Sequence, residues 1–246
     1  KIPVKGYAGV DSKNLQPIYN SDITLTDYNP SRPYANRDPR LEYSVFHDES
    51  TFKDRQLEFW AGGKDSRTSA ENSNNGSQLG YGIRKSLDES WSTKSVPSGS
   101  KQPWIYMRLS EFYLTYAEAQ YHLGNFAKAV EYVNLIRARS GVNMPAINSG
   151  GDLLAKIKHE RKIELAFEGN RWYDVRRWKD AEKEFAKDIV GVEVIKNAGT
   201  GAKSYRYFYF DGAKGKRSFP EYQSLFPIPI EEIRKSKLEQ NPFYEP

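Results

Sequence analysis

Three glutamates, Glu160, Glu164 and Glu168, recur every four residues in a stretch that also carries Arg161 and Arg171. A pair of carboxylates that flanks a glycosidic bond can hydrolyse it, one as acid and the other as base or nucleophile. Carboxylates that share one helix and alternate with arginines are more typical of structural ion pairs. Neighbouring arginines also lower a carboxyl pKa, which is the wrong direction for a general acid. The spacing therefore favours an ion-pair network over an active site.

The helical period places these charges among apolar residues. At about 100° per residue, one band of the predicted helix contains Leu154, Ile157, Arg161, Leu165 and Glu168, with Glu164 at its edge. Buried charge is costly unless it is paired and hydrogen-bonded. We therefore expect an internal network, to which Arg176 and Arg177 are also close enough in sequence to contribute. Its predicted members are Arg161, Glu164, Glu168, Arg171 and Asp174.

The sequence gives little support for other catalytic or metal-binding chemistry. The chain has no cysteine, which excludes disulfides, zinc thiolates and cysteine nucleophiles. His47, His122 and His159 are far apart and match no ligand spacing. Gly80-Tyr81-Gly82 lacks the third glycine of a dinucleotide loop. We expect no metal, no cofactor and no catalytic residue.

Aromatic side chains are the candidates for ligand binding. Aromatic residues make up 14% of the chain, with 17 Tyr and 5 Trp, and such rings stack on the apolar face of a sugar. The candidates on predicted loops are Tyr28, Tyr34, Trp60 and Trp91. Each ring could instead hold its loop onto the core. Trp104, Trp172 and Trp178 adjoin predicted helices and are expected in the core.

Charge and hydropathy exclude other classes of partner. The net charge is +5, from 37 basic and 32 acidic residues. Residues 203–217 mix basic side chains with tyrosines, a combination that can bind single-stranded nucleic acid. Because no nucleic-acid motif accompanies them, we interpret this segment as a solvated loop beside a strand. No apolar run approaches the ~20 residues of a membrane span.

The chain divides into two regions with different local sequence signals. Residues 1–103 are rich in turn-forming residues, with short extended pieces expected at 42–46 and 56–60. Residues 104–246 show helical periodicity. Helices are predicted at 104–123, 126–139, 152–168, 170–178 and 229–236, with a strand at 205–210. Gly124-Asn125 joins the first two helices into a hairpin that resembles a tetratricopeptide repeat.

Seven short sequence motifs, which we call marks, occur in order along the chain. They are Arg37-Asp38-Pro39-Arg40-Leu41, Gly80-Tyr81-Gly82 with Arg84-Lys85, Met107-Arg108-Leu109-Ser110-Glu111 leading to Tyr116-Ala117-Glu118-Ala119, Asn134-Leu135-Ile136-Arg137-Ala138-Arg139, residues 160–178, Leu225-Phe226-Pro227-Ile228-Pro229, and Gln240-Asn241-Pro242. This series resembles the SusD/RagB family of outer-membrane nutrient-binding lipoproteins. The resemblance implies a mainly α, SusD-like fold with a tetratricopeptide-like helix hairpin, long irregular loops and a few short strands.

The resemblance also implies an architecture and a role. Family members are roughly twice this length, so we expect the C-terminal half of one continuous domain, in which 1–103 is the loop-rich, ligand-facing region and 104–246 the helical region. The upstream half would carry the lipidated cysteine. Such proteins sit on the extracellular face of the outer membrane of Bacteroidetes-type bacteria and deliver oligosaccharides to a SusC-like TonB-dependent transporter, without enzymatic activity. Ligand residues vary between members, so the resemblance assigns none.

Three other functions remain open from the sequence. The same kind of importer subunit could capture peptides through its tyrosine-rich loops. A glycoside hydrolase would use the carboxylates of residues 160–168. A scaffold would contact only partner proteins through its helical hairpin.

Overall fold

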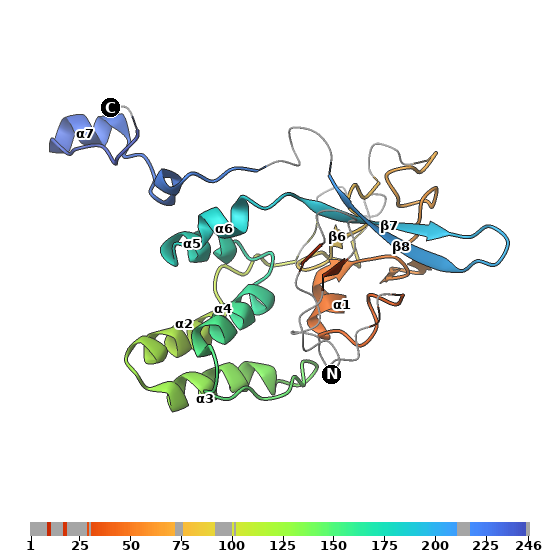
Figure 1. Cartoon of the computed structure of the whole chain (residues 1–246), viewed down its shortest axis with the longest axis horizontal. Helices are drawn as coiled ribbons and strands as arrows, with labels where there is room; N and C mark the ends of the chain where they lie inside the picture. The colour runs from red at the N-terminus through yellow and green to blue at the C-terminus, as the bar shows by residue number, and fades with distance from the viewer. Residues whose placement is uncertain are drawn as a thin grey trace. The chain divides into compact units, whose positions relative to one another are not determined.

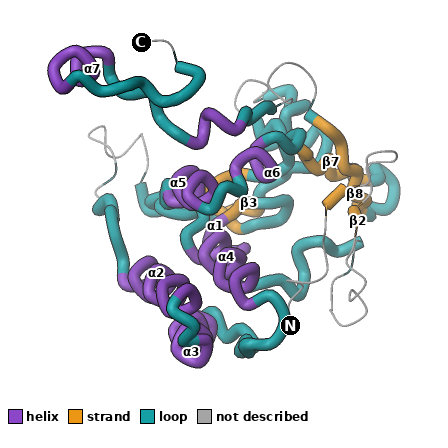
Figure 2. Tube along the Cα trace, turned by 60° about the vertical axis from the view of Figure 1, so that its left-hand side comes forward, coloured by secondary structure: helices purple, strands orange, loops and turns teal. Residues whose placement is uncertain are grey.

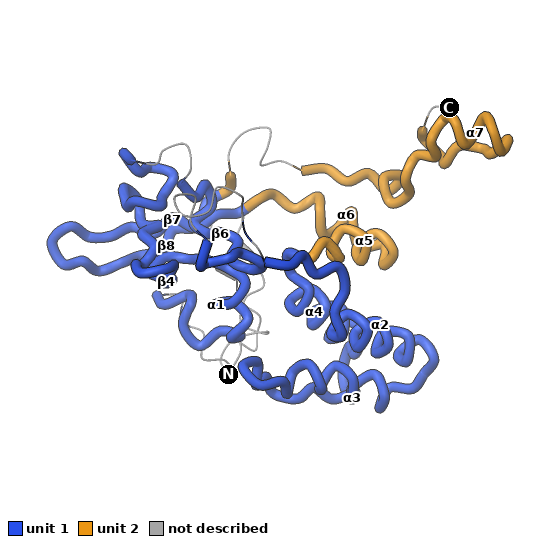
Figure 3. Tube along the Cα trace, turned by 180° about the vertical axis from the view of Figure 1, so that it is seen from behind, with its two compact units in different colours: residues 1–167, 190–208 blue, residues 168–189, 209–246 orange. Residues whose placement is uncertain are grey.

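The computed structural model describes residues 9–10, 17–18, 29, 31–71, 76–91, 100, 102–210 and 217–244. The chain divides into two compact units, residues 1–167 with 190–208 and residues 168–189 with 209–246 (Figure 3). The described residues form seven α-helices and short strand pairs, which confirms the predicted mainly α class. The predicted division of the chain at residue 103 stays a prediction.

Three helices form the apolar core of the first unit. They are α2 (Leu109–His122), α3 (Phe126–Arg137) and α4 (Leu153–Glu164), and α2 packs against both of the others (Figures 1 and 2). Gly124, with φ of 80°, supplies the left-handed turn of the predicted α2–α3 hairpin. Ala117 and Ala129 are fully buried in the core that the three helices share. Their small side chains allow the helices to approach closely.

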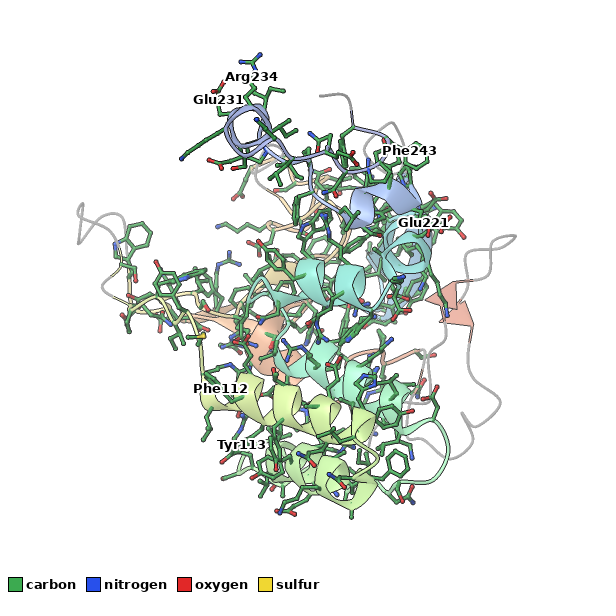
Figure 4. The ribbon with its side chains drawn as sticks, turned by 90° about the vertical axis from the view of Figure 1, so that its left-hand side faces the viewer. Phe112, Tyr113, Glu221, Glu231, Arg234 and Phe243 are labelled. Carbon is green, nitrogen blue, oxygen red and sulfur yellow. The ribbon has the colours of Figure 1, made fainter. Side chains whose placement is uncertain are left out.

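The buried face of α2 contains Leu114, Ala117 and Glu118, whereas Leu109, Phe112 and Tyr116 are exposed. The helical period of the sequence places Leu109, Phe112, Tyr113, Tyr116, Ala117 and Gln120 on one face, of which the structure buries only Ala117. The residues on both faces keep a helical period, so periodicity alone does not distinguish them. The helix also begins at Leu109 rather than at residue 104. Figure 4 shows Phe112 and Tyr113 near the beginning of α2.

The N-terminal cap of α4 agrees with its local sequence. The Asp152 carboxylate accepts a hydrogen bond from the Ala155 amide at 2.8 Å, as the sequence predicts. The helix ends at Glu164, four residues before the predicted end. Phe167 and Gly169 both adopt positive φ, 64° and 85°, which a continuing helix does not allow.

A short helix replaces one of the predicted extended segments. Residues 42–46 were expected to be extended, but α1 (Arg40–Ser44) covers the first three of them. Asp38 turns the chain, because its Oδ1 accepts from the Arg40 amide at 2.9 Å and its carbonyl accepts from the Leu41 amide at 2.9 Å. These local bonds favour a helical start over a strand.

Paired short strands organise the rest of the first unit. β3 (Val45–Phe46) pairs antiparallel with β6 (Gly82–Ile83), so that Phe46 lies opposite Gly82. β4 (Thr51–Phe52) and β5 (Arg55–Gln56) form a tight hairpin, and β1 (Gly9–Val10) pairs with β2 (Pro17–Ile18). β7 (Val190–Lys196) pairs with β8 (Lys203–Tyr209), which overlaps the predicted strand. The predicted extended segment 56–60 is a strand only at Gln56.

The second unit has a small core of its own. It contains α5 (Asn170–Arg177), α6 (Ala181–Phe185), a 3₁₀ helix η2 (Glu221–Ser224) and α7 (Ile230–Ser236), the last of which agrees with the prediction. Its buried residues are Val175, Ala181 and Phe219, and Trp178 packs against them. Trp172, expected in the core, is 42% exposed, although its ring stacks on Phe185. Within the described part of the chain, no helix is both long enough and apolar enough to cross a membrane.

Candidate functional site

A cavity of about 480 Å³ opens among the short strands of the first unit. We call it the aromatic groove. Its lining includes Phe46, Phe52, Phe59 and Tyr81, with Arg55 and Asp65. The volume lies within the range of small-molecule sites, which combine apolar walls with a few polar groups. The groove is therefore the right size for one or two sugar rings or a short peptide.

The apolar wall of the aromatic groove is anchored in a buried cluster. Phe46, Leu57 and Phe59 are buried and pack together. The ring of Phe52 packs edge-on against Phe46, with centroids 5.1 Å apart. Because strand pairing and packing hold these residues, the wall is pre-organised for a ligand.

An ion pair lies in the lining of the same groove. The Arg55 guanidinium donates to both oxygens of Asp65, at 2.7 and 2.6 Å. Asp65 also accepts from the Glu58 amide at 2.9 Å. Burial raises the pKa of Asp65, but the hydrogen bonds from Arg55 and from the Glu58 amide outweigh burial and lower it. The carboxylate is thus ionised at neutral pH, and the pair offers donors and acceptors in one plane to sugar hydroxyls or peptide groups.

Tyr34, one of the four predicted ligand residues, packs against Tyr81, which lines the groove. Its ring stacks on His47 at 4.0 Å and meets the ring of Tyr81 edge-on at 6.2 Å. The ring of Tyr205 also contacts the Tyr34 ring edge-on. Burial raises the pKa of the Tyr34 hydroxyl, which has no hydrogen-bond partner among the described residues. Tyr34 therefore positions Tyr81, which is 38% exposed and lines the groove.

Trp60 and Trp91 are absent from the described lining of this groove. Trp60 lies along β7, where the Ala61 amide donates to the Val194 carbonyl at 2.7 Å and the Lys196 ammonium sits 4.7 Å from the indole. Trp91 is half-buried, and its carbonyl accepts from Lys53 at 2.6 Å. Tyr28 lies outside the described residues. A ligand role for these rings stays a prediction.

Sequence reasoning missed the residues that do line the groove. Tyr81 belongs to Gly80-Tyr81-Gly82, one of the seven marks, but the sequence did not predict a ligand role for it. Phe52 and Arg55 are opposite one another in the β4–β5 hairpin, and Asp65 is ten residues beyond Arg55 in the chain. The one available signal was the short run of residues 51–56, whose central pair Lys53-Asp54 suits a tight turn.

Two buried glutamates of α4 organise a second group of charges. We call this group the Arg–Glu cluster, and it consists of Arg40, Arg108, Arg137, Arg139, Glu160 and Glu164. Glu164 accepts from Arg40 at 2.9 Å, from Arg108 at 2.6 Å and from Arg139 at 2.8 Å.

Glu160 holds the remaining arginine of the cluster. It accepts from Arg40 at 2.6 Å and from Arg137 at 2.5 Å. Arg40 thus bridges the two glutamates. All of these residues belong to the first unit.

The carboxylate of Glu164 is held in the ionised form. Burial raises the pKa of Glu164, but hydrogen bonds from Arg139, Arg108 and Arg40 outweigh it and lower the pKa to about 2. A carboxyl with this pKa cannot serve as a general acid at neutral pH. The described residues also contain no group of three or more His, Asp or Glu that could hold a metal ion.

Of the five predicted network residues, only Glu164 belongs to the Arg–Glu cluster. Arg161 donates to the Thr115 hydroxyl at 3.0 Å and lies 3.9 Å from Glu111. In the second unit, Arg171 pairs with Glu184 at 2.7 Å and Asp174 with Arg177 at 3.1 Å, and Glu168 is half-buried. The arginines that contact Glu164 come from three of the family marks, at residues 37–41, 107–111 and 134–139.

A further cavity, of about 440 Å³, lies in the second unit. Tyr222 and Phe243 line it together with the carboxylates of Glu182 and Glu221; Figure 4 labels Glu221 and Phe243. Phe243 is 85% exposed. With one of its two rings so open to solvent, this cavity is less pre-organised than the aromatic groove, so we regard the groove as the stronger candidate site.

An exposed apolar strip precedes and begins α2. Trp104, expected in the core, is 69% exposed, and the following residues are exposed as well. The strip consists of Trp104, Ile105, Tyr106, Met107, Leu109 and Phe112. Contiguous exposed apolar surface of this kind marks sites of contact with other protein segments or partners.

Comparisons with known proteins agree on one family. The model of the SusD family matches residues 7–244. The chain is similar to the SusD-like protein P2 of Formosa agariphila, with 34% identity in a match that covers 40% of this chain and 25% of that protein. Among solved structures, it is similar to a SusD-like protein from Bacteroides fragilis, with a TM-score of 0.68 and 25% identity, over 96% of this chain and 45% of the other.

A second solved protein, BT4246, shows the same likeness. Its TM-score is 0.67 and its identity 25%, over 85% of this chain and 37% of that chain. These likenesses confirm the predicted SusD-like fold. In each of the three matches the chain accounts for less than half of the relative's length.

Proposed function

We propose that this chain, which belongs to the SusD family, is part of a cell-surface protein that captures oligosaccharides and delivers them to a TonB-dependent outer-membrane transporter. Binding is non-covalent and involves no catalysis. The observation that carries the proposal is the aromatic groove, where pre-organised rings lie beside the Arg55–Asp65 pair. The resemblance to the family supports the location on the extracellular face of the outer membrane and the transporter partner.

The chemistry of the groove suits a sugar. An exposed ring such as Tyr81 stacks on the apolar face of a pyranose, while a planar Arg–Asp pair donates to and accepts from adjacent hydroxyls. The low pKa of Glu164 argues against the glycoside hydrolase alternative, because hydrolysis needs a carboxyl that stays protonated.

Calorimetric titration of the full-length protein with a panel of neutral oligosaccharides tests this function. At least one glycan is expected to bind, and Tyr81→Ala is expected to weaken binding at least tenfold. Tyr106→Ala is the matched control, because Tyr106 is 86% exposed and does not line the groove. Trp60→Ala in the same series measures whether that ring contributes, as the sequence predicts.

Other outcomes of the titration identify the alternatives. Binding of peptides with no binding of any glycan would replace the proposal with peptide capture. Release of reducing ends from a polysaccharide over days at high protein concentration would indicate a hydrolase. Tight pairing with a barrel transporter without any small ligand would indicate a scaffold.

A further inference from the structure

The cavity of about 440 Å³ in the second unit combines aromatic rings with acidic side chains. We call it the acidic aromatic pocket. Its rings are Tyr222 and Phe243, and its charged groups are Glu182, Glu221 and Lys179. They come from the beginning of α6 and the residues before it, from η2 and from the C-terminal segment. All of the described lining belongs to the second unit, so the pocket is separate from the aromatic groove of the first unit.

Side-chain hydrogen bonds hold the C-terminal segment that carries Phe243. The Gln240 amide group donates to the Ile228 carbonyl at 2.9 Å and accepts from the Ile228 backbone amide at 2.8 Å. The Asn241 side chain donates to the Phe226 carbonyl at 2.6 Å. The last two of the seven marks therefore bind each other, which fixes the backbone on one side of the pocket.

The two rings of the pocket differ in exposure. Tyr222 is half-buried, and its ring lies 5.8 Å from that of Phe243 and meets the Tyr244 ring edge-on at 5.5 Å. The Tyr244 hydroxyl donates to the Leu225 carbonyl at 3.0 Å, which anchors this contact. Phe243 is 85% exposed, so most of its ring is open to contact with a ligand. The face of such a ring attracts cations.

The charged groups of the pocket carry an excess of negative charge. Two carboxylates, those of Glu182 and Glu221, line it with one ammonium, that of Lys179. Among the described residues, no ion pair involves any of these three groups. Two arginines of α5 pair elsewhere, with Glu184 and Asp174. The pocket therefore offers two carboxylates, and one negative charge in excess, beside an exposed ring.

From this arrangement we propose that the acidic aromatic pocket binds a protonated primary amine on a ligand about the size of a sugar ring. The carboxylates accept hydrogen bonds from the ammonium group, while the ring of Phe243 attracts the same cation. The hydroxyl of Ser224, which also lines the pocket, can donate to or accept from a polar group beside the amine. The volume lies within the range of small-molecule sites.

An amino sugar and a lysine side chain both carry such an amine. Titration calorimetry of the full-length protein in low-salt buffer at about pH 6, where aliphatic amines are protonated, distinguishes them with three probes. These are D-glucosamine, N-acetyl-L-lysine amide and the uncharged N-acetyl-D-glucosamine. At least one amine is expected to bind five times more tightly than N-acetyl-D-glucosamine, and added salt weakens that binding.

The order of the two amines identifies the source of the ligand. Tighter binding of D-glucosamine assigns the pocket to amino sugars, and tighter binding of the lysine derivative assigns it to basic side chains. Binding of both amines equal to or weaker than that of N-acetyl-D-glucosamine would overturn the proposal.

Two variants that keep side-chain volume localise the amine to the pocket. Glu182→Gln and Glu221→Gln each remove one carboxylate, and both residues are exposed, so neither change disturbs the core. Each variant is expected to weaken binding of the tighter amine at least threefold and to leave N-acetyl-D-glucosamine within about twofold. Glu239→Gln is the matched control, because Glu239 is exposed and absent from the described lining. Unchanged amine affinity in both pocket variants would contradict the proposal.

Phe243→Leu tests the contribution of the ring. Leucine keeps an apolar side chain at this exposed position but lacks the aromatic face, so amine affinity is expected to fall at least threefold. An unchanged affinity would refute the contact between the cation and the ring.

The inference does not depend on the proposed function. If neutral oligosaccharides bind in the aromatic groove but no amine binds in the acidic aromatic pocket, the inference fails and the proposed function stands. If an amine binds in the pocket and no neutral oligosaccharide binds, the proposed function fails and the inference stands.

Discussion

Replacement of Glu164 by glutamine is expected to destabilise the first unit by about 3 kcal/mol. Glu164 is 2% exposed and accepts hydrogen bonds from three arginines. Glutamine keeps the shape of the side chain but removes the charge, so Arg40, Arg108 and Arg139 lose the carboxylate that they share, while Arg40 still pairs with Asp38 and Glu160. Removal of one partner from a buried ion pair typically costs about 3–5 kcal/mol. The lower end applies here because Arg108 and Arg139 are partly exposed and water can solvate them.

The pKa of Glu164 gives the same magnitude by another route. The Arg–Glu cluster lowers this pKa from 4.5 to about 2. At about 1.4 kcal/mol for each pH unit, the ionised form is stabilised in the folded state by roughly 3 kcal/mol. Because the folded pKa lies below the unfolded one, this stability is present above about pH 4.5 and is lost as the pH falls toward 2. The glutamine variant lacks it at every pH.

Urea unfolding followed by circular dichroism measures both effects. At pH 7 the variant is expected to lie about 3 kcal/mol below the wild type, and the difference is expected to shrink as the pH falls from 4.5 toward 2. Hydrogen exchange of the α4 amides localises the loss to the first unit. Glu131→Gln is the matched control, because Glu131 forms an exposed pair with Lys128, and exposed pairs contribute little to stability. A loss below about 0.5 kcal/mol for Glu164→Gln, the value expected at a featureless surface site, would refute a buried network.

Three further changes are expected to have defined outcomes. Asp152→Ala removes the N-terminal cap of α4 and is expected to cost about 1 kcal/mol in urea unfolding, whereas Asp152→Asn, which can still cap, should cost little. Gly80→Ala places a Cβ 2.1 Å from the Val192 carbonyl, while Gly201→Ala has the same positive φ but open space. Thermal or urea unfolding should therefore show Gly80→Ala to be more destabilising, by about 2 kcal/mol; equal losses would mean that the contact with β7 is loose. Arg55→Gln breaks a half-exposed ion pair and is expected to change stability by less than about 1 kcal/mol. Glycan affinity should nevertheless fall tenfold in calorimetry, and an unchanged affinity would place the ligand elsewhere.

Local signals explain which parts of the fold could be predicted. The α2–α3 hairpin follows from the helical period and from Gly124 between the helices, and the beginning of α4 follows from the Asp152 cap. These features depend on residues within a few positions of each other. Two buried charges of α4, Arg161 and Glu164, were also recognisable, because a helical period shows which residues share a face, whereas the buried Glu160 was not placed in that band.

Long-range partners could not be predicted in this way. The arginines that contact Glu164 lie 124, 56 and 25 residues away, as Arg40, Arg108 and Arg139. Arg171, only seven residues beyond Glu164, was favoured by proximity in sequence, but the structure pairs it with Glu184. A helical period identifies a buried face without identifying the residues that pack across it.

The aromatic groove illustrates the same limit. Its rings lie in or next to short strands whose pairings no sequence period reveals, so Phe52 and Tyr81 carried no stronger local signal than Trp60 or Trp91. Size and loop position favoured the tryptophans. The strand pairings β3–β6 and β4–β5 instead selected the smaller rings that line the cavity.

A crystal structure of the full-length protein with its tightest-binding oligosaccharide tests the central claim most directly. The account predicts a sugar ring stacked against Tyr81 in the aromatic groove, with hydroxyl groups within hydrogen-bond distance of Arg55 or Asp65. An oligosaccharide bound elsewhere, with no contact to these three side chains, would contradict it.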